Sequence, residues 1–93
     1  MGTPVVVCDV TIRNRLGLHA RASAQFVKTA SRFAAEITVD TGSQSVNGKS
    51  IMGLLLLAAP QGRTLTLRAV GEDAAAAVQA LAELIERRFG EPE

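Results

Sequence analysis

The sequence predicts an α+β fold in which helices cover one face of a mostly antiparallel four-stranded sheet. Two observations carry this prediction. Segments that alternate apolar and polar residues, as half-buried strands do, lie between segments whose apolar residues recur with the period of a helix. Their order is strand, helix, strand, strand, helix, strand, helix, and a two-layer sandwich with the helices on one side of the sheet accommodates that order.

Length and composition narrow the functional classes. With 93 residues, the chain has the size of one domain, so we expect residues 1–93 to form a single unit with a modest core and no deep cleft. Ten Lys and Arg residues against nine Asp and Glu, three Phe and neither Trp nor Tyr argue against nucleic-acid binding. The sequence shows no secretory signal and no apolar stretch of spanning length, so we expect a cytoplasmic protein without membrane insertion.

The first strand is predicted around residues 6–12, where Val6, Cys8, Val10 and Ile12 alternate with more polar neighbours. Cys8 is the single cysteine, so it cannot form an internal disulfide. It also lacks partners at the spacing of a metal site. We therefore expect Cys8 to be a small buried hydrophobic side chain, and we expect neither a metal nor another cofactor.

The first helix is predicted over residues 20–34, because its apolar and polar residues separate onto two faces. The apolar arc holds Ala22, Phe26, Ala30 and Phe33, and a basic stripe holds Arg21, Gln25, Lys28 and Arg32. A strand with Ile37 and Val39 inward follows, and the turn residues "DTGSQS" lead into a short strand over residues 45–47. The two strands are expected to form a hairpin.

The segment "KSIMGLLLLAA", residues 49–59, is too apolar all round for an ordinary surface helix, so it predicts a short, partly exposed helix closed by the turn at residues 60–62. Its four consecutive leucines cannot all face a core. Either these leucines are buried against the sheet to a greater extent than a surface helix requires, or some of them form an exposed docking patch.

The last strand and the last helix complete the order. Leu65, Leu67 and Ala69 alternate with polar residues and predict a strand. The final helix is predicted over residues 73–89, with acidic residues at its start and basic residues at its end, which suits the helix dipole. Its apolar stripe holds Val78, Leu81, Ala82, Ile85 and Phe89.

The single histidine, His19, lies between a turn at Gly17 and the predicted start of the first helix. Backbone N–H groups there lack carbonyl partners and attract anions, phosphate above all. The positive end of the helix also favours the neutral imidazole, which is a competent nucleophile. Arg21 adds a planar cation that can make paired hydrogen bonds to phosphate oxygens. These residues suggest a histidine that accepts a phosphoryl group.

Other interpretations of His19 remain open from the residues alone. An ordinary surface histidine in a loop also fits the local pattern, and the local pattern by itself favours it. One histidine without ligands at suitable spacing does not make a metal site. A hydrolase is not supported, since no nucleophile, base and orienting acid stand out as a set.

The segments "IRNRLGLHARASA" and "VNGKSIMGLLLLAA" resemble, in order and spacing, two motifs of the HPr family, the histidine phosphocarriers of the bacterial phosphoenolpyruvate-dependent phosphotransferase system. The resemblance implies the open-faced β-sandwich of that family, with four strands and three helices. It also implies that His19 is phosphorylated on Nδ1 and that Arg21 stabilises the phosphate. Phosphorylated enzyme I is the implied donor and an enzyme IIA the implied acceptor, so the protein is expected to be a carrier and not an enzyme.

Ala22 departs from the sugar-type pattern, which has proline after the arginine. Alanine forms helix well, so the site is expected to survive with a less fixed helix start. The absence of this proline, together with the "GKSIMGLLLLAA" style of second motif, places the chain closer to the nitrogen-related branch of the family.

Ser50 is expected to cap the short helix, and its hydroxyl then accepts a free backbone N–H. The family resemblance implies a second role as the serine modified by HPr kinase/phosphorylase, although Gly48 replaces a larger apolar residue common in other members. Partner docking is expected to use Lys28, Arg32, Lys49, Ile51, Met52 and Leu55. An alternative function is a regulatory binding module, in which Ser50 phosphorylation and the apolar helix at residues 51–57 govern association with a target.

Overall fold

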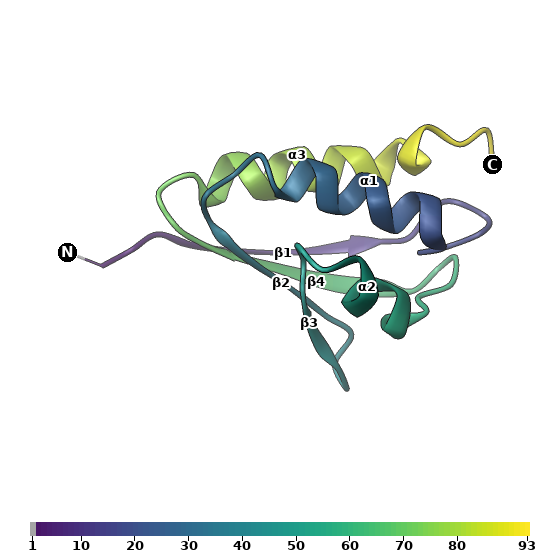
Figure 1. Ribbon diagram of the computed structural model, residues 1–93, viewed down its shortest axis with the longest axis horizontal. Coiled ribbons are helices and arrows are strands. Elements are labelled where there is room, and N and C mark those ends of the chain that lie inside the picture. The colour runs from purple at the N-terminus through teal and green to yellow at the C-terminus, as the bar shows by residue number, and fades with distance from the viewer. Residues whose placement is uncertain (1) are drawn as a thin grey trace.

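The computed structural model describes residues 2–93, which form a four-stranded sheet and three α-helices (Figure 1). The sheet contains β1 (Val5–Thr11), β4 (Thr64–Val70), β2 (Glu36–Asp40) and β3 (Ser45–Asn47), side by side in that order. Every pair of neighbours is antiparallel: Cys8 lies opposite Leu67, and Thr38 lies between Arg68 and Asn47. The predicted α+β architecture is confirmed.

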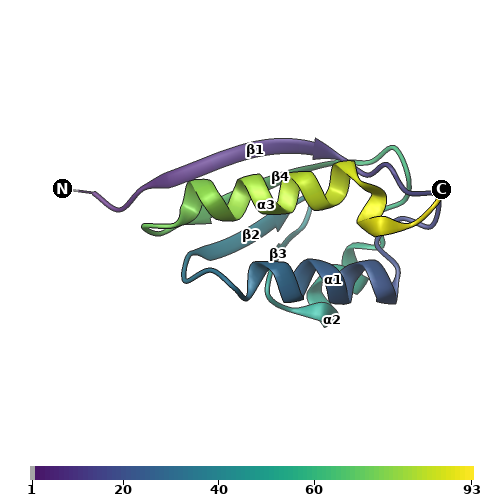
Figure 2. The same cartoon turned by 90° about the horizontal axis from the view of Figure 1, so that it is seen from above.

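The helices are α1 (Ala20–Ala30), α2 (Ile51–Leu57) and α3 (Ala74–Glu86). Figures 1 and 2 show α1 and α3 side by side on one face of the sheet, with α3 over β1 and β4. The short α2 packs on α1 and β3. Phe26 of α1, Leu67 of β4 and Leu81 of α3 meet in one fully buried core. Among residues 2–93, no helix has the length and hydrophobicity needed to cross a bilayer.

The burial of the strands follows the predicted alternation. In β4, Leu65, Leu67 and Ala69 are buried, while Thr64 and Arg68 are exposed. Cys8 differs from expectation, because it is only partly buried. The reason is its position on β1, an edge strand with a neighbour on one side only.

The first helix is shorter than predicted, since α1 ends at Ala30 and not at residue 34. The N–H groups of Arg32 and Phe33 bond to carbonyls three residues back, so the chain is already turning toward β2. The carboxylate of Asp73 accepts the next two backbone N–H groups, from Ala34 at 2.8 Å and Ala35 at 2.9 Å. This contact from the start of α3 fixes the turn, and it was not visible in the local pattern.

The last helix also ends early. After α3 the chain forms a tight 3-10 turn, Arg88–Gly90, in which Arg88 and Phe89 adopt left-handed backbone angles with φ of 58° and 55°. Phe89, predicted to continue the helical stripe, is buried in the core from this turn. The reversal sends the last residues back toward the loop between β1 and α1, where the C-terminus lies in Figures 1 and 2.

The short apolar helix is confirmed with bounds inside the predicted segment. Leu54 and Leu57 of α2 are buried, and Leu55 and Leu56 face outward. The helix ends at Ala58, which adopts a left-handed conformation with φ of 49°. The four leucines therefore divide between the core and the surface, as their sequence required.

Candidate functional site

The loop before α1 is held by a close backbone contact that requires glycine. Gly17 has φ of 67°, and a methyl group at its Cα would lie 2.3 Å from the carbonyl oxygen of Ala59. The N–H of Leu18 donates to that same carbonyl at 2.9 Å. The loop is therefore fixed against the chain that leaves α2.

His19 is the N-cap residue of α1, with extended backbone angles and no capping bond from its side chain. Its carbonyl accepts the N–H of Ser23 at 2.9 Å, which closes the first turn of the helix. No acidic residue occupies that first turn. The N–H groups that begin α1 consequently create a positive end beside the imidazole, as expected from the sequence.

A carboxylate from the C-terminal tail contacts the imidazole. Nε2 of His19 is hydrogen-bonded to Oε2 of Glu91. The other carboxylate oxygen, Oε1, accepts a hydrogen bond of 2.9 Å from Nδ2 of Asn14, and Nδ2 also donates to the Gly17 carbonyl at 2.8 Å. Asn14 is fully buried, the Glu91 side chain is 11% exposed, and that of His19 is 28% exposed.

Residues on either side of this contact hold the tail in place. The backbone N–H of Arg15 donates to the Glu93 carbonyl at 2.9 Å, and its Nε lies 3.0 Å from the Glu93 carboxylate. The ion pair is exposed, so its own contribution to folding is small. Together with the backbone bond it keeps the tail beside residues 14–19.

The charge state of Glu91 follows from its surroundings. Desolvation acts to raise the pKa of Glu91, but hydrogen bonds from Asn14 and His19 and the charges of His19 and Arg21 outweigh it. The net result is a pKa below the ordinary value of 4.5. Near neutral pH, Glu91 is therefore an ionised carboxylate, which can only accept hydrogen bonds.

The site opens to solvent through a shallow hollow of about 210 Å³. Arg21 is exposed and lines this hollow together with His19. The lining residues are Arg15, Leu16, His19, Arg21, Glu91, Pro92 and Glu93. A hollow of this kind can receive a group presented by another protein, but it does not enclose a small substrate.

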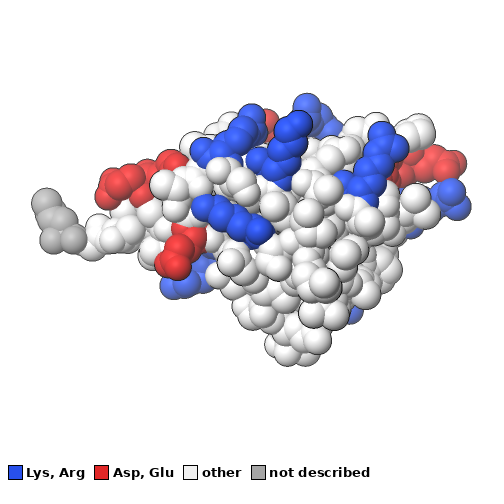
Figure 3. Space-filling view, viewed as in Figure 1, with Lys and Arg blue, Asp and Glu red and all other residues white. Residues whose placement is uncertain are grey.

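The predicted docking residues lie on two neighbouring surfaces. Ile51, Met52 and Leu55 are exposed on α2, and the sequence prediction omitted Leu56 and Leu16, which are 68% and 60% exposed. We call the four exposed residues of α2, which are Ile51, Met52, Leu55 and Leu56, the apolar patch. Figure 3 shows basic side chains gathered over α1, where Lys28 belongs, and Lys28 and Arg32 line one hollow with Arg87. Arg32 lies beyond the end of α1.

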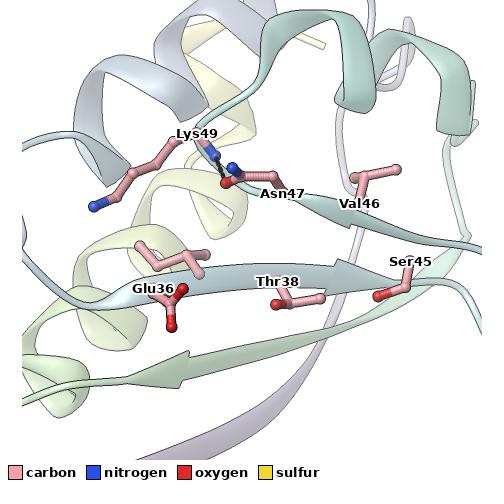
Figure 4. A pocket seen from close by; sticks show the side chains of 7 residues that line it. Glu36, Thr38, Ser45, Val46, Asn47 and Lys49 are labelled. Atoms are coloured by element: carbon pink, nitrogen blue, oxygen red, sulfur yellow. Dashed lines mark hydrogen bonds between the residues drawn. The ribbon is translucent and has the colours of Figure 1, made fainter.

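Lys49 is less available than the other predicted docking cations. Its Nζ donates to the Phe33 carbonyl at 2.6 Å, and the residue is half-buried. Lys49 also lines a polar hollow of about 380 Å³ along β2 and β3, shown in Figure 4 with Glu36 and Thr38. That hollow brings together neither a nucleophile with a base nor a set of metal ligands.

Ser50 caps α2 as predicted. Its Oγ accepts the N–H of Gly53 at 3.0 Å, and the residue is half-exposed. Ser50 lies at the start of α2, whereas the loop before His19 contacts Ala59, just beyond the end of α2. In the part of the chain that the structure describes, no group of three or more His, Cys, Asp or Glu residues is placed to hold a metal ion.

Sequence reasoning found His19 and Arg21 but missed Asn14 and Glu91. The contact of Glu91 with His19 joins residues 72 positions apart, and no local pattern signals it. Asn14 is an unusual polar residue in a core position, but from the sequence alone it was one more residue of a loop.

Comparison with known proteins gives one consistent family. The family described as "PTS HPr component phosphorylation site" matches residues 6–87. A phosphocarrier protein HPr of Xylella fastidiosa (strain Temecula1) is 52% identical over 83 residues, which cover 89% of this chain and 93% of that protein. A phosphocarrier protein NPr of Shewanella violacea is 45% identical over 83 residues, 89% of this chain and 91% of that protein.

A solved structure agrees with these similarities. The crystal structure of HPr-C-His from Thermoanaerobacter tengcongensis superposes with a TM-score of 0.91 at 44% sequence identity. The superposition covers 95% of this chain and 99% of that chain.

Proposed function

The chain belongs to the HPr family of phosphocarrier proteins of the phosphotransferase system, and from this membership we propose that His19 is the residue that carries the phosphoryl group. The supporting observation is the position of His19 at the start of α1, beside free backbone N–H groups and Arg21. A carrier of this kind is not an enzyme, because it is itself the molecule that is phosphorylated by one partner and dephosphorylated by the next.

The proposed step transfers the phosphoryl group from the donor protein to Nδ1 of His19. The lone pair on Nδ1 of His19 forms a bond to phosphorus while the bond from phosphorus to the donor breaks. Arg21 and the N–H groups of α1 stabilise the negative oxygens as the group passes. Phosphoryl transfer needs mainly positioning and charge stabilisation, so an open hollow suffices when the partner supplies the rest of the site.

The proposed partners are phosphorylated enzyme I as donor and an enzyme IIA as acceptor. The apolar patch is on α2, which packs against α1, the helix that begins just after His19, and the exposed Leu16 lines the hollow that contains His19. Lys28 and Arg32 add positive charge for an acidic partner surface. An exposed apolar surface with a charged border suits brief contacts with successive partners. The proposal places the exchange in the cytoplasm.

The test is the intact mass of the protein after incubation with phosphoenolpyruvate and a cognate enzyme I. Wild type should gain one phosphate that is lost in acid, because phosphohistidine is acid-labile. His19→Ala should fold normally and gain nothing. A wild type that stays unmodified beside an enzyme I of demonstrated activity would contradict the proposal.

The nitrogen-related branch is a finer part of the same proposal. It is supported by Ala22 after Arg21 and by the similarity to the NPr of Shewanella violacea, while the HPr of Xylella fastidiosa is the more similar of the two. Transfer from phosphorylated protein to a nitrogen-type and a sugar-type enzyme IIA separates the branches. Faster transfer to the nitrogen-type acceptor is expected, and faster transfer to the sugar-type acceptor would contradict the assignment.

A second role is proposed for Ser50, as a site for HPr kinase/phosphorylase. Ser50 is half-exposed at the start of α2, next to the exposed Ile51 and Met52. A phosphate there adds nearly two negative charges beside the docking surface and should slow exchange with an acidic partner. This placement also suits the alternative function, a binding module whose association depends on Ser50 phosphorylation.

Incubation with such a kinase should give one acid-stable phosphate in wild type and in Ser45→Ala, an exposed serine of β3, but none in Ser50→Ala. Equal labelling of Ser50→Ala and wild type would remove Ser50 from the proposal.

A further inference from the structure

The C-terminal tail, residues 89–93, places the Glu91 carboxylate beside His19, and contacts along the whole tail hold it there. Phe89 is buried from a left-handed turn, which reverses the chain. Two residues later Glu91 contacts His19, and Glu93 is tied to Arg15. Glu91 lies beyond residues 6–87, the part of the chain that the family description matches.

The contact decides which ring nitrogen carries a proton. An ionised carboxylate only accepts hydrogen bonds, so Nε2 of His19 must be the donor to Glu91. In a neutral imidazole the other nitrogen, Nδ1, is then unprotonated and its lone pair is free. Nδ1 is the atom proposed above as the nucleophile.

Asn14 orients the carboxylate. Its Nδ2 faces two acceptors, the Glu91 carboxylate and the Gly17 carbonyl. The reverse amide orientation would turn Oδ1 toward both of these oxygens, so the donor assignment follows from the geometry. Asn14 is fully buried, and within residues 2–93 its Oδ1 finds no hydrogen-bond partner. The Asn14 side chain therefore links the Gly17 carbonyl to the Glu91 carboxylate through its Nδ2 group.

We propose that Glu91, oriented by Asn14, is a positioning residue that holds Nε2–H of His19 and so presents the Nδ1 lone pair to phosphorus. The inference rests on the proposed function, since it concerns the same histidine. As the bond from Nδ1 to phosphorus forms and the donor bond breaks, the proton on Nε2 stays in place. The ring becomes positively charged, and the adjacent carboxylate compensates that charge.

The decisive variant is Glu91→Gln, which keeps the size of the side chain but removes its charge. A glutamine can either accept from Nε2–H or donate to Nε2, so it no longer fixes the tautomer. The control is Glu83→Gln, which removes an exposed carboxylate of α3 that does not line the hollow of His19.

Two measurements are made on wild type and both variants. Nitrogen-15 NMR of the unphosphorylated protein should show His19 with its proton on Nε2 in wild type and Glu83→Gln, and a mixture of tautomers in Glu91→Gln. Acceptance of phosphate from phosphorylated enzyme I should be about tenfold to a hundredfold slower in Glu91→Gln, the loss expected for one charged hydrogen bond. Glu83→Gln should react at the wild-type rate.

A Glu91→Gln variant with the wild-type tautomer and rate would overturn the inference. Equal slowing in Glu83→Gln would also overturn it, because the effect would then belong to the net charge of the protein and not to the contact with His19. If wild type itself accepts no phosphate, the proposed function fails, whereas the tautomer measured without phosphate still decides whether Glu91 positions the ring.

Discussion

At the scale of single residues, the candidate site around His19 depends on residues that fix the backbone beside it. Gly17 adopts a left-handed angle and approaches the Ala59 carbonyl, which fixes the loop that ends at His19. The positions of His19 and Arg21 in the candidate site were predictable, because they follow from local order: a turn, a helix start and a cation two residues on. The positions of Asn14 and Glu91 beside them were not, since they arise only when the tail folds back.

Replacing Gly17 by alanine should lower stability more than the same change at Gly62. Both glycines have positive φ, but a methyl group at Gly62 meets nothing within 4 Å, whereas at Gly17 it would lie 2.3 Å from Ala59 oxygen. Gly62→Ala should cost about 1–2 kcal/mol from its backbone angle alone, and Gly17→Ala clearly more. Thermal unfolding of both variants measures the difference. Equal melting temperatures would contradict the close approach.

Arg21→Ala should accept phosphate from phosphorylated enzyme I about ten- to a hundredfold more slowly, because one charged partner of the phosphate is lost. The control is Arg68→Ala, which removes an exposed arginine from β4 on the side of the sheet away from the helices. Stopped-reaction mass spectrometry gives both rates. Wild-type kinetics in Arg21→Ala would remove the role assigned to this residue.

At the scale of elements, helix ends are where sequence and structure differ. The apolar periodicity of α1 and α3 was correct, but each pattern ran past the end of its helix because Phe33 and Phe89 continue the apolar series from turns. For α1, the turn is held by Asp73, which lies far along the chain. Such contacts end a helix without any break in its pattern.

The division of α2 into an inner and an outer face makes a prediction for two leucines. Leu54 is fully buried, so Leu54→Ala should lower the free energy of unfolding by about 2–5 kcal/mol. Leu56 is 68% exposed, so Leu56→Ala should leave stability nearly unchanged but weaken binding to enzyme I. Chemical denaturation and a binding titration test the pair. Normal affinity in Leu56→Ala would exclude it from the docking surface.

Asp73 should make part of the stability depend on pH. A hydrogen bond from the backbone N–H of Ala34 lowers the pKa of Asp73, and desolvation opposes this effect. The N–H of Ala35 and the charge of Lys49 also lower it, so the pKa of Asp73 is below its ordinary value of 3.8. A carboxylate whose pKa is lowered by folding stabilises the fold at pH values above its pKa in the unfolded chain. This stabilisation is lost as the pH falls toward the pKa of the carboxylate in the folded protein.

Asp73→Asn should therefore be less stable than wild type near neutral pH, and the difference should shrink as pH falls below 3.8. Denaturant titrations at several pH values measure it, with the exposed neighbour Glu72→Gln as control. A difference that stays constant at all pH values would mean that the Asp73 charge does not hold the turn.

At the scale of the whole molecule, the order of helices and strands along the sequence predicted the two layers but not which strands are neighbours in the sheet. Alternation predicts which face of each strand is buried, whereas the placement of β4 between β1 and β2 depends on pairing across the chain. The family resemblance implied an open-faced β-sandwich but gave no order of the strands. The same distant pairing closes the site, because β1, α1 and the tail meet at one end of the sheet (Figure 2).

The most direct test of the central proposal is nitrogen-15 NMR of the uniformly labelled protein after phosphorylation by enzyme I. Coupling between phosphorus and Nδ1 of His19, with the proton retained on Nε2, is the expected result. It would identify the residue, the atom and the state of the ring together. Phosphorus coupled to Nε2, or phosphate found on another residue, would contradict the proposed transfer at His19.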